Sequence, residues 1–268
     1  MERRDFLATF GAAAIGGLAT EETAALAQAG STTSPEFYVW REYALRNGTG
    51  PGRLTAFLRD AAVPALNRLG HKPIGVFEVV AGVPSPTVFV LTPHASLDSV
   101  ATMESRLSAD AAFMKAAAPY FDATAADPIY VRQEVSVMAA APKLPRIEVP
   151  AATAAGGPRL FELRTYESHN ERGHRLKVRM FDEMGEIEIF KRVGLNLVFF
   201  GRTLAGPRMP NLTYMLVFDN QAAREKAWDA FRKDPEWAKL RATPGFADSE
   251  IVSNITTVLL RPAGYSQI

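Results

Sequence analysis

The sequence predicts an α+β protein in which two ferredoxin-like modules follow one another, each with the element order β-α-β-β-α-β. The first observation is a similarity between two strand-like stretches. Residues 37–43 read FYVWREY and residues 160–166 read LFELRTY, and both alternate as a strand does. Their Arg-x-Tyr endings are related by one offset, since 164 − 41 = 166 − 43 = 123. The second observation is that the helix and strand signals after each stretch come in the same order.

Composition fits a globular chain and excludes several kinds of site. The 268 residues, 47% of them apolar, suit one large domain or two small ones. A net charge of +1 gives no electrostatic case for binding nucleic acid or an anionic membrane. The chain has no cysteine, which excludes disulfides, thiolate nucleophiles and cysteine-ligated zinc. The four histidines lack the HExxH spacing, so we predict no metal site.

The first residues resemble a twin-arginine export signal. Arg3 and Arg4 precede Phe-Leu and an apolar run that is too short to cross a bilayer as a stable helix. Cleavage sites of the A-x-A type end at Ala27 and Ala29. We therefore assign residues 1–29 to a signal peptide and expect a periplasmic or secreted protein with no stable membrane insertion after cleavage. The alternative is an amphipathic helix with chance arginines.

We assign residues 34–141 to the first module. Pro64 is expected to kink its first helix, and Gly70 to end it. Pro93 is expected to break the third strand, and Pro119 to stop a short helix. Strands are predicted at 37–45, 74–80, 87–91 and 129–139, and helices at 54–69, 96–108 and 111–118.

Residues 142–158 are rich in Pro, Ala and Gly, and we predict a linker there. Residues 159–262 form the second module and residues 263–268 a tail. Asp234 and Pro235 are the expected N-cap and first residue of a short helix. Strands are predicted at 160–166, 195–203, 212–218 and 251–260, and longer helices at 174–192 and 221–233.

The second module resembles the NIPSNAP family. The resemblance rests on a Phe-Glu-Leu-Arg-Thr-Tyr strand, a Gly…Phe-Phe-Gly strand, an Asn before the third strand and an Asp-Pro-Glu-Trp motif. These stand at Phe161–Tyr166, Gly194–Gly201, Asn211 and Asp234–Trp237. The first module is similar to a degenerate copy, because it lacks the Asp-Pro-x-Trp motif. It keeps Arg41, Tyr43, Gly70, Asp110 and Lys115.

The family is similar in fold to the dimeric α/β barrels, in which two ferredoxin-like units pair their sheets around a cavity. The resemblance implies that the two modules close into a barrel-like pseudo-dimer, and a further homo-dimer is considered. Physics favours this closure, because a sheet with helices on one face leaves its other face bare. Covering that face stabilises the fold by about 25 cal/mol per Å² of apolar area. The superfamily includes small monooxygenases, haem-degrading enzymes and peroxidases, whereas NIPSNAP members share no established reaction.

Polar side chains of the two opening strands are the candidate binding residues. We expect them on the sheet face away from the helices, where they would line the inter-sheet cavity and hold a carboxylate or another anion. The alternative is an Arg–Glu pair that holds the two sheets in register. Phe199 and Phe200 alternate, and Phe200 is our candidate for an apolar wall of the cavity. The polar set is Arg41, Tyr43, Glu162, Arg164 and Tyr166.

The histidines allow two interpretations. His169 and His174 flank the turn after the first strand of the second module, and His174 is included among the cavity candidates. It would be a general base or a haem ligand at the cavity mouth. The alternative is that both are solvated loop and cap residues. His71 and His94 fall at predicted turns and are interpreted in the same two ways.

The predicted function is that of an exported NIPSNAP-type protein. It would bind a small hydrophobic or anionic ligand, or a protein partner, in the inter-sheet cavity. We predict no cofactor and assign no catalytic residue. The alternative is a dimeric α/β barrel monooxygenase, or a haem-binding or haem-degrading enzyme. A histidine that projects into the barrel would favour the enzyme, and histidines confined to loops would favour the binding protein.

Overall fold

The computed structural model describes residues 34–84 and 86–268. The predicted signal peptide, with its cleavage sites after Ala27 and Ala29, lies outside these ranges. Within them, no helix combines the length and apolar character needed to span a membrane.

The first module has the predicted element order. Its first helix is not broken at Pro64, because a π-helical segment precedes the proline and the helix continues beyond it. Strand pairing also continues through Pro93, and Pro119 lies inside the last helix. The elements are β1 Phe37–Ala44, α1 Gly50–Phe57, η2 Leu58–Ala62, α2 Val63–Arg68, β2 Gly75–Ala81, β3 Thr87–His94, α3 Leu97–Ser108, α4 Ala111–Phe121 and β4 Arg132–Ala140.

The second module repeats this order with one long helix divided in two. The predicted helix at 174–192 is interrupted before Gly185, whose φ of 95° belongs to the left-handed region. A short helix, α5 Ala151–Ala154, lies in the linker. The other elements are β5 Leu160–Glu167, α6 Glu171–Asp182, α7 Glu186–Val193, β6 Asn196–Ala205, β7 Asn211–Phe218, α8 Gln221–Lys233, α9 Pro235–Arg241, α10 Asp248–Ile251 and β8 Asn254–Pro262.

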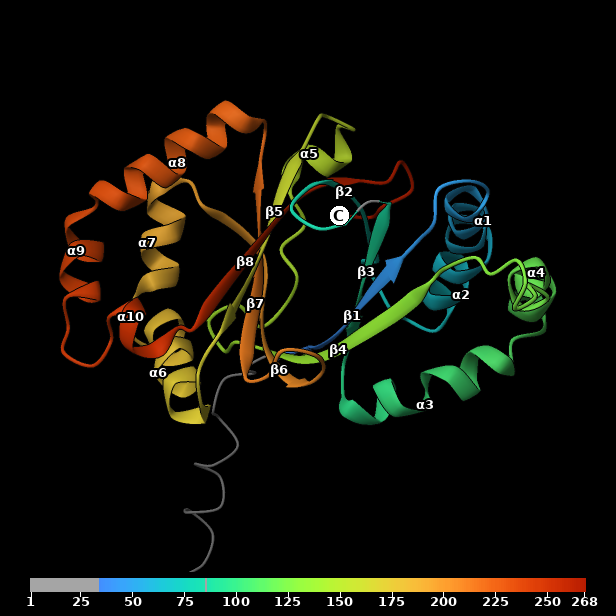
Figure 1. Cartoon of the computed structure of the whole chain (residues 1–268), viewed down its shortest axis with the longest axis horizontal. Helices are drawn as coiled ribbons and strands as arrows, with labels where there is room; N and C mark the ends of the chain where they lie inside the picture. Colours follow the sequence, from blue (N-terminus) through green and yellow to red (C-terminus); the bar gives the residue numbers. More distant parts are fainter. Residues whose placement is uncertain (1–33, 85) are drawn as a thin grey trace, which may run out of the picture. The chain divides into compact units, whose positions relative to one another are not determined.

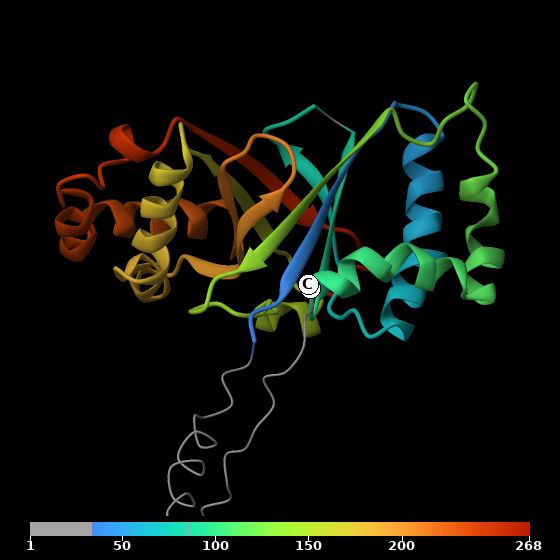
Figure 2. The same ribbon diagram turned by 90° about the horizontal axis from the view of Figure 1, so that it is seen from below.

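The strands form a closed antiparallel barrel in the order β1-β3-β2-β8-β5-β7-β6-β4. The two modules join edge to edge, through β2 with β8 and through β4 with β6. Helices α1 to α4 cover one side of the barrel and helices α6 to α10 the opposite side (Figures 1 and 2). This confirms the predicted fold class of two tandem ferredoxin-like modules that pair their sheets.

The strands therefore have two covered faces, although residues at the end of β2 and along part of β4 are exposed. One face points into the barrel, where aromatic side chains including Trp40 and Phe199 form a single cluster. The other face packs under the helices of its own module, around Leu54 in the first and Phe190 in the second. Both faces bury apolar area, so the hydrophobic effect stabilises the barrel from inside and outside.

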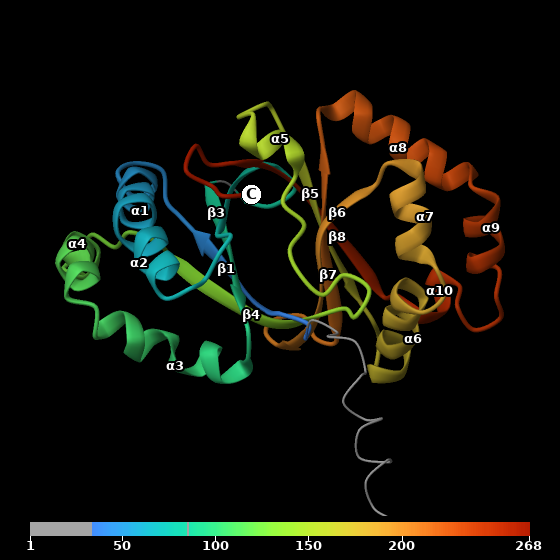
Figure 3. The ribbon, with the colours of Figure 1, turned by 180° about the vertical axis from the view of Figure 1, so that it is seen from behind.

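The residues after β8 are part of the sheet structure. The backbone N–H of Gln267 donates to the carbonyl of Ile74 at 2.9 Å, and Ser266 Oγ accepts from the N–H of Val76 at 3.0 Å. Ile268 is fully buried in the interior cluster. The carboxyl terminus accordingly lies beside β2 and β3 (Figure 3).

Candidate functional site

The candidate side chains of the opening strands lie on the outer, helix-facing side of the barrel, so their predicted placement in the inter-sheet cavity is wrong. Tyr43 packs under the first-module helices and Tyr166 under the second-module helices. The interior face of the same strands carries Trp40 and Leu163. Alternation predicted which residues share a face. It could not identify the inner face, because both faces of a strand are buried in a barrel that helices cover.

Phe200 also faces the helices, and its neighbour Phe199 faces the barrel interior. Phe200 lies 5.0 Å from Phe181 of α6, centroid to centroid. The register of β6 shifts between Leu197 and Phe199, and this bulge places both Val198 and Phe199 inside. The prediction for Phe200 is therefore wrong, because strict alternation cannot anticipate an inserted residue.

In the second module the predicted residues form a polar network between the sheet and α8. The carboxylate of Glu162, a fully buried residue, accepts from Arg164 at 3.0 Å, from Arg224 at 2.8 and 3.1 Å, and from Trp228 Nε1 at 2.7 Å. Arg164 also donates to Tyr166 Oη at 3.1 Å. An Arg–Glu pair is thus present, but it joins sheet to helix within one module rather than sheet to sheet. A buried carboxylate is stable only when opposite charges and hydrogen-bond donors compensate for its lost hydration, as they do here.

A second buried charge cluster supports the same module. Lys177 Nζ lies 3.2 Å from a Glu186 oxygen and 3.1 Å from an Asp248 oxygen. Burial raises the pKa of Glu186 to about 7, although the Lys177 ammonium acts in the opposite direction. These contacts tie α6 to α7 and α10, so we interpret them as internal support for the helix layer.

His174 does not reach the barrel interior. It is buried in α6, where burial and the nearby guanidinium of Arg202 lower its pKa. No histidine is among the residues that line the barrel cavity in the described part of the chain. The predicted placement of His174 at the cavity mouth is therefore wrong.

His71 and His94 form a buried pair that the sequence did not suggest. Their ring centroids lie 4.3 Å apart, and both side chains are almost wholly buried. His71 Nδ1 lies 2.8 Å from the carbonyl oxygen of Pro93, so it carries the hydrogen. The Nε2 atoms of both rings have no hydrogen-bond partner among the described residues. The second module has Leu195 and Phe218 at these positions, since 195 − 71 = 218 − 94 = 124.

A cavity of about 530 Å³, measured as space for the centres of water molecules, lies between the outer face of the first-module sheet and its helices. We call it the first-module pocket. Its volume is in the range of small-molecule sites. Polar groups at its wall come from Arg41, Thr92, Glu104, Ser108 and Gln133. Its other walls are mainly apolar and aromatic: Tyr43, Phe57, Leu58, Ala62, Leu66, Val90, Met103, Leu107, Phe113, Met114, Tyr120, Phe121 and Tyr130.

Arg41 brings a guanidinium to this pocket, whose wall also carries the Glu104 carboxylate. In residues 34–84 and 86–268 Arg41 forms no ion pair, whereas its counterpart Arg164 is bonded to Glu162. The sequence explains the difference, because the position of Glu162 is taken by Val39 in the first module (162 − 39 = 123). The guanidinium is therefore available to an anion at the pocket wall.

The pocket exists because the first module has smaller side chains where the second module has aromatic ones. Strand register makes Val90 the counterpart of Tyr214, since these two residues pair with Arg41 and Arg164. The same offset, 214 − 90 = 124, relates three further pairs. When smaller side chains replace aromatic ones and the surrounding structure does not close the gap, a cavity remains. The three further pairs are Leu66 with Phe190, Glu104 with Trp228, and Leu107 with Phe231.

Contacts between aromatic rings hold the aromatic wall of the first-module pocket in place. Phe57 and Tyr120 stack at 3.7 Å between centroids with 12° between their planes. Burial, with Tyr43 and Tyr130 nearby, raises the pKa of Tyr120 far above its usual range, so its hydroxyl stays protonated. At the rim, Phe121 is half exposed. The wall can therefore stack a flat apolar ligand and offer phenolic O–H donors.

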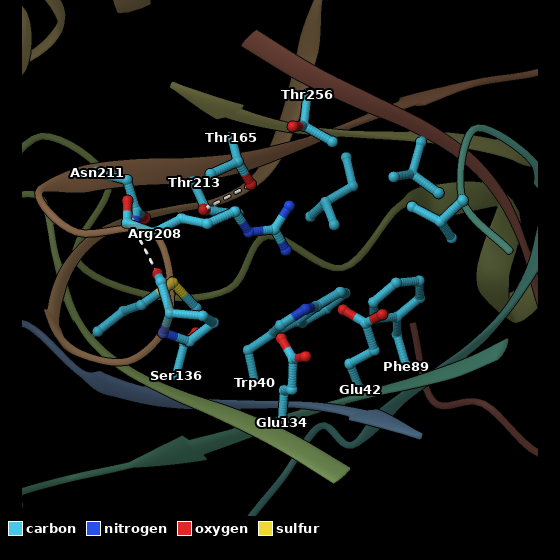
Figure 4. Close-up of a pocket in the computed structure, with 15 residues that line it drawn as sticks. Trp40, Glu42, Phe89, Glu134, Ser136, Thr165, Arg208, Asn211, Thr213 and Thr256 are labelled. Atoms are coloured by element: carbon cyan, nitrogen blue, oxygen red, sulfur yellow. Dashed lines mark hydrogen bonds between the residues drawn. The ribbon is translucent and has the colours of Figure 1, made fainter. Parts of the chain in front are cut away.

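The inter-sheet cavity is present but small. It offers about 40 Å³ to the centres of water molecules, room for roughly three waters. Figure 4 shows Thr165, Thr213 and Arg208 on one side of it, opposite Trp40 and Glu42. We call it the barrel cavity. It is too small for the hydrophobic ligand that the sequence suggested.

Comparison with protein-family models finds a match in the second module. Residues 161–267 match the NIPSNAP family model. The NIPSNAP match begins in β5 and continues past the end of β8, so it covers the second module and leaves the first outside. No curated protein matches the chain.

Of three similar solved structures, two match the chain over the whole barrel and one matches a smaller part. A proposed monooxygenase from Lactobacillus acidophilus NCFM is 9% identical, with 85% of this chain and 94% of that chain covered and a TM-score of 0.55. An anthrone oxidase-like protein is 10% identical, with 87% and 93% covered and a TM-score of 0.51. A NIPSNAP-like domain protein from Burkholderia xenovorans is 18% identical over 39% of this chain and 85% of that one, with a TM-score of 0.35. At 9% and 10% identity, the likeness to the first two structures concerns the fold alone.

Proposed function

We propose that this protein binds a small, flat, hydrophobic molecule with an anionic group in the first-module pocket. The observation that carries the proposal is Arg41, a guanidinium without an ion pair in the described chain, at the wall of a largely aromatic cavity. Arg41 is partly exposed, and its guanidinium can form charge-assisted hydrogen bonds to an anion at this position. The aromatic wall would hold the apolar body of the ligand. Arg41 and Tyr43 thus remain our candidate ligand-binding residues, in a different cavity from the one predicted.

The test uses 2-naphthoate, a flat aromatic carboxylate, as the probe. We expect saturable binding by isothermal titration calorimetry, and at least about tenfold weaker binding by Arg41→Gln, since a charge-assisted hydrogen bond is lost. Arg46→Gln is the control, because Arg46 is an exposed arginine outside the pocket. Leu107→Phe, which restores the second-module side chain, should also block binding. Equal affinity of wild type and Arg41→Gln would refute the assignment.

Location is a separate part of the proposal. We propose export by the twin-arginine route, supported by the Arg3-Arg4 pair and the small-residue cleavage sites. Sequencing the amino terminus of periplasmic protein should give Gln28 or Gly30. Changing both arginines to lysine should retain the precursor in the cytoplasm. Native mass spectrometry of the exported protein would reveal a co-purified ligand, and would also show whether it forms a homo-dimer or carries a protein partner.

An oxygenase is the second candidate function. It is favoured by the fold shared with a proposed monooxygenase and an anthrone oxidase-like protein. A version with a histidine-ligated haem fits poorly, because no histidine lines either the first-module pocket or the barrel cavity in the described residues. Oxygen consumption with an oxidisable aromatic substrate, lost in Arg41→Gln, would support the oxygenase. If the protein shows neither haem absorbance nor oxygen uptake, the result would favour the binding function over the oxygenase.

A further inference from the structure

The barrel cavity lies between equivalent positions of the two modules. Glu42 pairs with Phe89 and Glu134 in the first module, as Thr165 pairs with Thr213 and Thr256 in the second. Glu42 and Thr165 are themselves counterparts, since 165 − 42 = 123. One wall of the cavity is thus acidic and aromatic, and the opposite wall carries hydroxyl groups (Figure 4). A barrel made of two identical units could not have two different walls.

Arg208 reaches this cavity from the turn between β6 and β7. Its φ of 59° is in the left-handed region, which a non-glycine residue seldom adopts. Asn211 holds the turn, because its Nδ2 donates to the carbonyls of Pro207 and Arg208, both at 3.0 Å. Thr203 Oγ1 in turn donates to Asn211 Oδ1 at 2.6 Å. Asn211, one of the motif residues of the sequence, therefore acts as the support that directs Arg208 over the barrel cavity.

Two opposite charges border the barrel cavity without meeting. Neither Glu42 nor Arg208 forms an ion pair with any other described residue, whereas Glu134 is paired with Arg132 at 3.0 Å. Burial and the neighbouring Glu134 raise the pKa of Glu42, while Arg208 and Arg132 act in the opposite direction. The space between the two charges holds roughly three waters. A molecule with both charges would satisfy both groups at once.

We propose that the barrel cavity is a binding site for a small zwitterion of the size of glycine, with its carboxylate at Arg208 and its ammonium group at Glu42. The threonine hydroxyls of the second-module wall supply further hydrogen bonds, and Trp40 closes the opposite side. This site is separate from the first-module pocket, so it does not depend on the function proposed for that pocket.

Trp40 provides the reporter, because its ring lines the cavity while the other two tryptophans, Trp228 and Trp237, lie in the second-module helix layer. Its indole N–H signal, assigned with Trp40→Phe, is followed by NMR during titration of the full-length protein with glycine. We expect a saturable shift. Acetate alone and methylammonium alone should bind at least about tenfold more weakly, since each satisfies one charge.

Two variants test the roles of the charges. Arg208→Asn removes the guanidinium and keeps a residue that tolerates the left-handed backbone, and Glu42→Gln removes the carboxylate charge. Each should weaken glycine binding at least about tenfold. Arg202→Asn, at an exposed position on β6, is the matched control and should bind normally. No shift with glycine, normal binding by Arg208→Asn, or equal binding of acetate would each overturn the proposal.

Discussion

At the scale of single residues, the two modules differ in how their buried polar groups are hydrogen-bonded. Glu162 satisfies its charge through Arg164, Arg224 and Trp228. His71 and His94, in contrast, bury two Nε2 atoms without partners among the described residues. An unsatisfied buried acceptor costs about 1–3 kcal/mol, so the imidazole pair is less stable than the Leu–Phe pair of the second module would be there.

We predict that His94, buried against His71, makes stability depend on pH between about 4 and 6.5. Burial first, and then His71, lower the pKa of His94 to about 4, whereas unfolded histidine titrates near 6.5. Through His94 the unfolded state binds more protons in this window, so the contribution of His94 to the free energy of unfolding falls as pH drops through it. The full difference from His94 is about 3 kcal/mol. The raised pKa of Glu186 contributes in the opposite direction, and the variant below separates the two.

Urea unfolding at pH 4, 5, 6 and 7 checks this prediction. The double variant His71→Leu, His94→Phe copies the second-module pair and should lose this part of the pH dependence while remaining at least as stable at pH 7. An unchanged pH profile in the double variant would contradict the prediction and assign the effect to carboxylates elsewhere.

At the scale of elements, the helix starts are the features that sequence patterns predicted most directly. Asp234 Oδ1 accepts from the N–H groups of Glu236 at 2.9 Å and Trp237 at 3.0 Å, as its N-cap position predicts. Its second oxygen accepts from Arg192 at 2.8 Å. Asp110 repeats the arrangement in the first module, with Phe113 as the N–H donor and Arg68 as the ion-pair partner.

We predict that Asp234→Ala lowers the free energy of unfolding by about 2 kcal/mol, because the helix cap and the ion pair are both lost. Asp234→Asn keeps an oxygen for the cap and should cost less than about 1 kcal/mol. Chemical denaturation of the two variants measures the difference. If Asp234→Asn were as damaging as Asp234→Ala, the ion pair to Arg192 rather than the cap would carry the effect.

At the scale of the whole molecule, the barrel depends on both modules. The interior cluster takes Trp40 and Phe89 from the first module and Phe161 and Phe199 from the second. Each module alone would expose this apolar face and two unpaired strand edges. The tail adds Ile268 of the second half to a slot beside Phe77 of the first.

We therefore predict that residues 34–158 and 159–268, expressed separately, do not form folded monomers. Co-expression should give a one-to-one complex with a native-like NMR spectrum, because the interior face is then covered. Size-exclusion chromatography with light scattering measures the stoichiometry. A dispersed monomer spectrum from either half alone would contradict this view of the barrel as one cooperative unit.

The sequence determined the doubled architecture and much of its local structure. The repeated Arg-x-Tyr strands, the common offsets and the capping residue Asp234 depend on local geometry and on periodicity, both of which are present in the amino-acid sequence. These signals were sufficient for the number, type and order of most elements.

Tertiary structure alone decided which face of each strand is inside and where the cavities lie. Arg41 and Tyr43 face the helices rather than the barrel, because the bulky Trp40 and Tyr38 fill the interior and both faces are buried. The bulge beside Phe199, the contact of His71 with His94, and the placement of Arg208 and Glu42 around one cavity all involve residues that are unpatterned or distant in sequence. Such contacts arise from closure of the barrel, and no local periodicity encodes them.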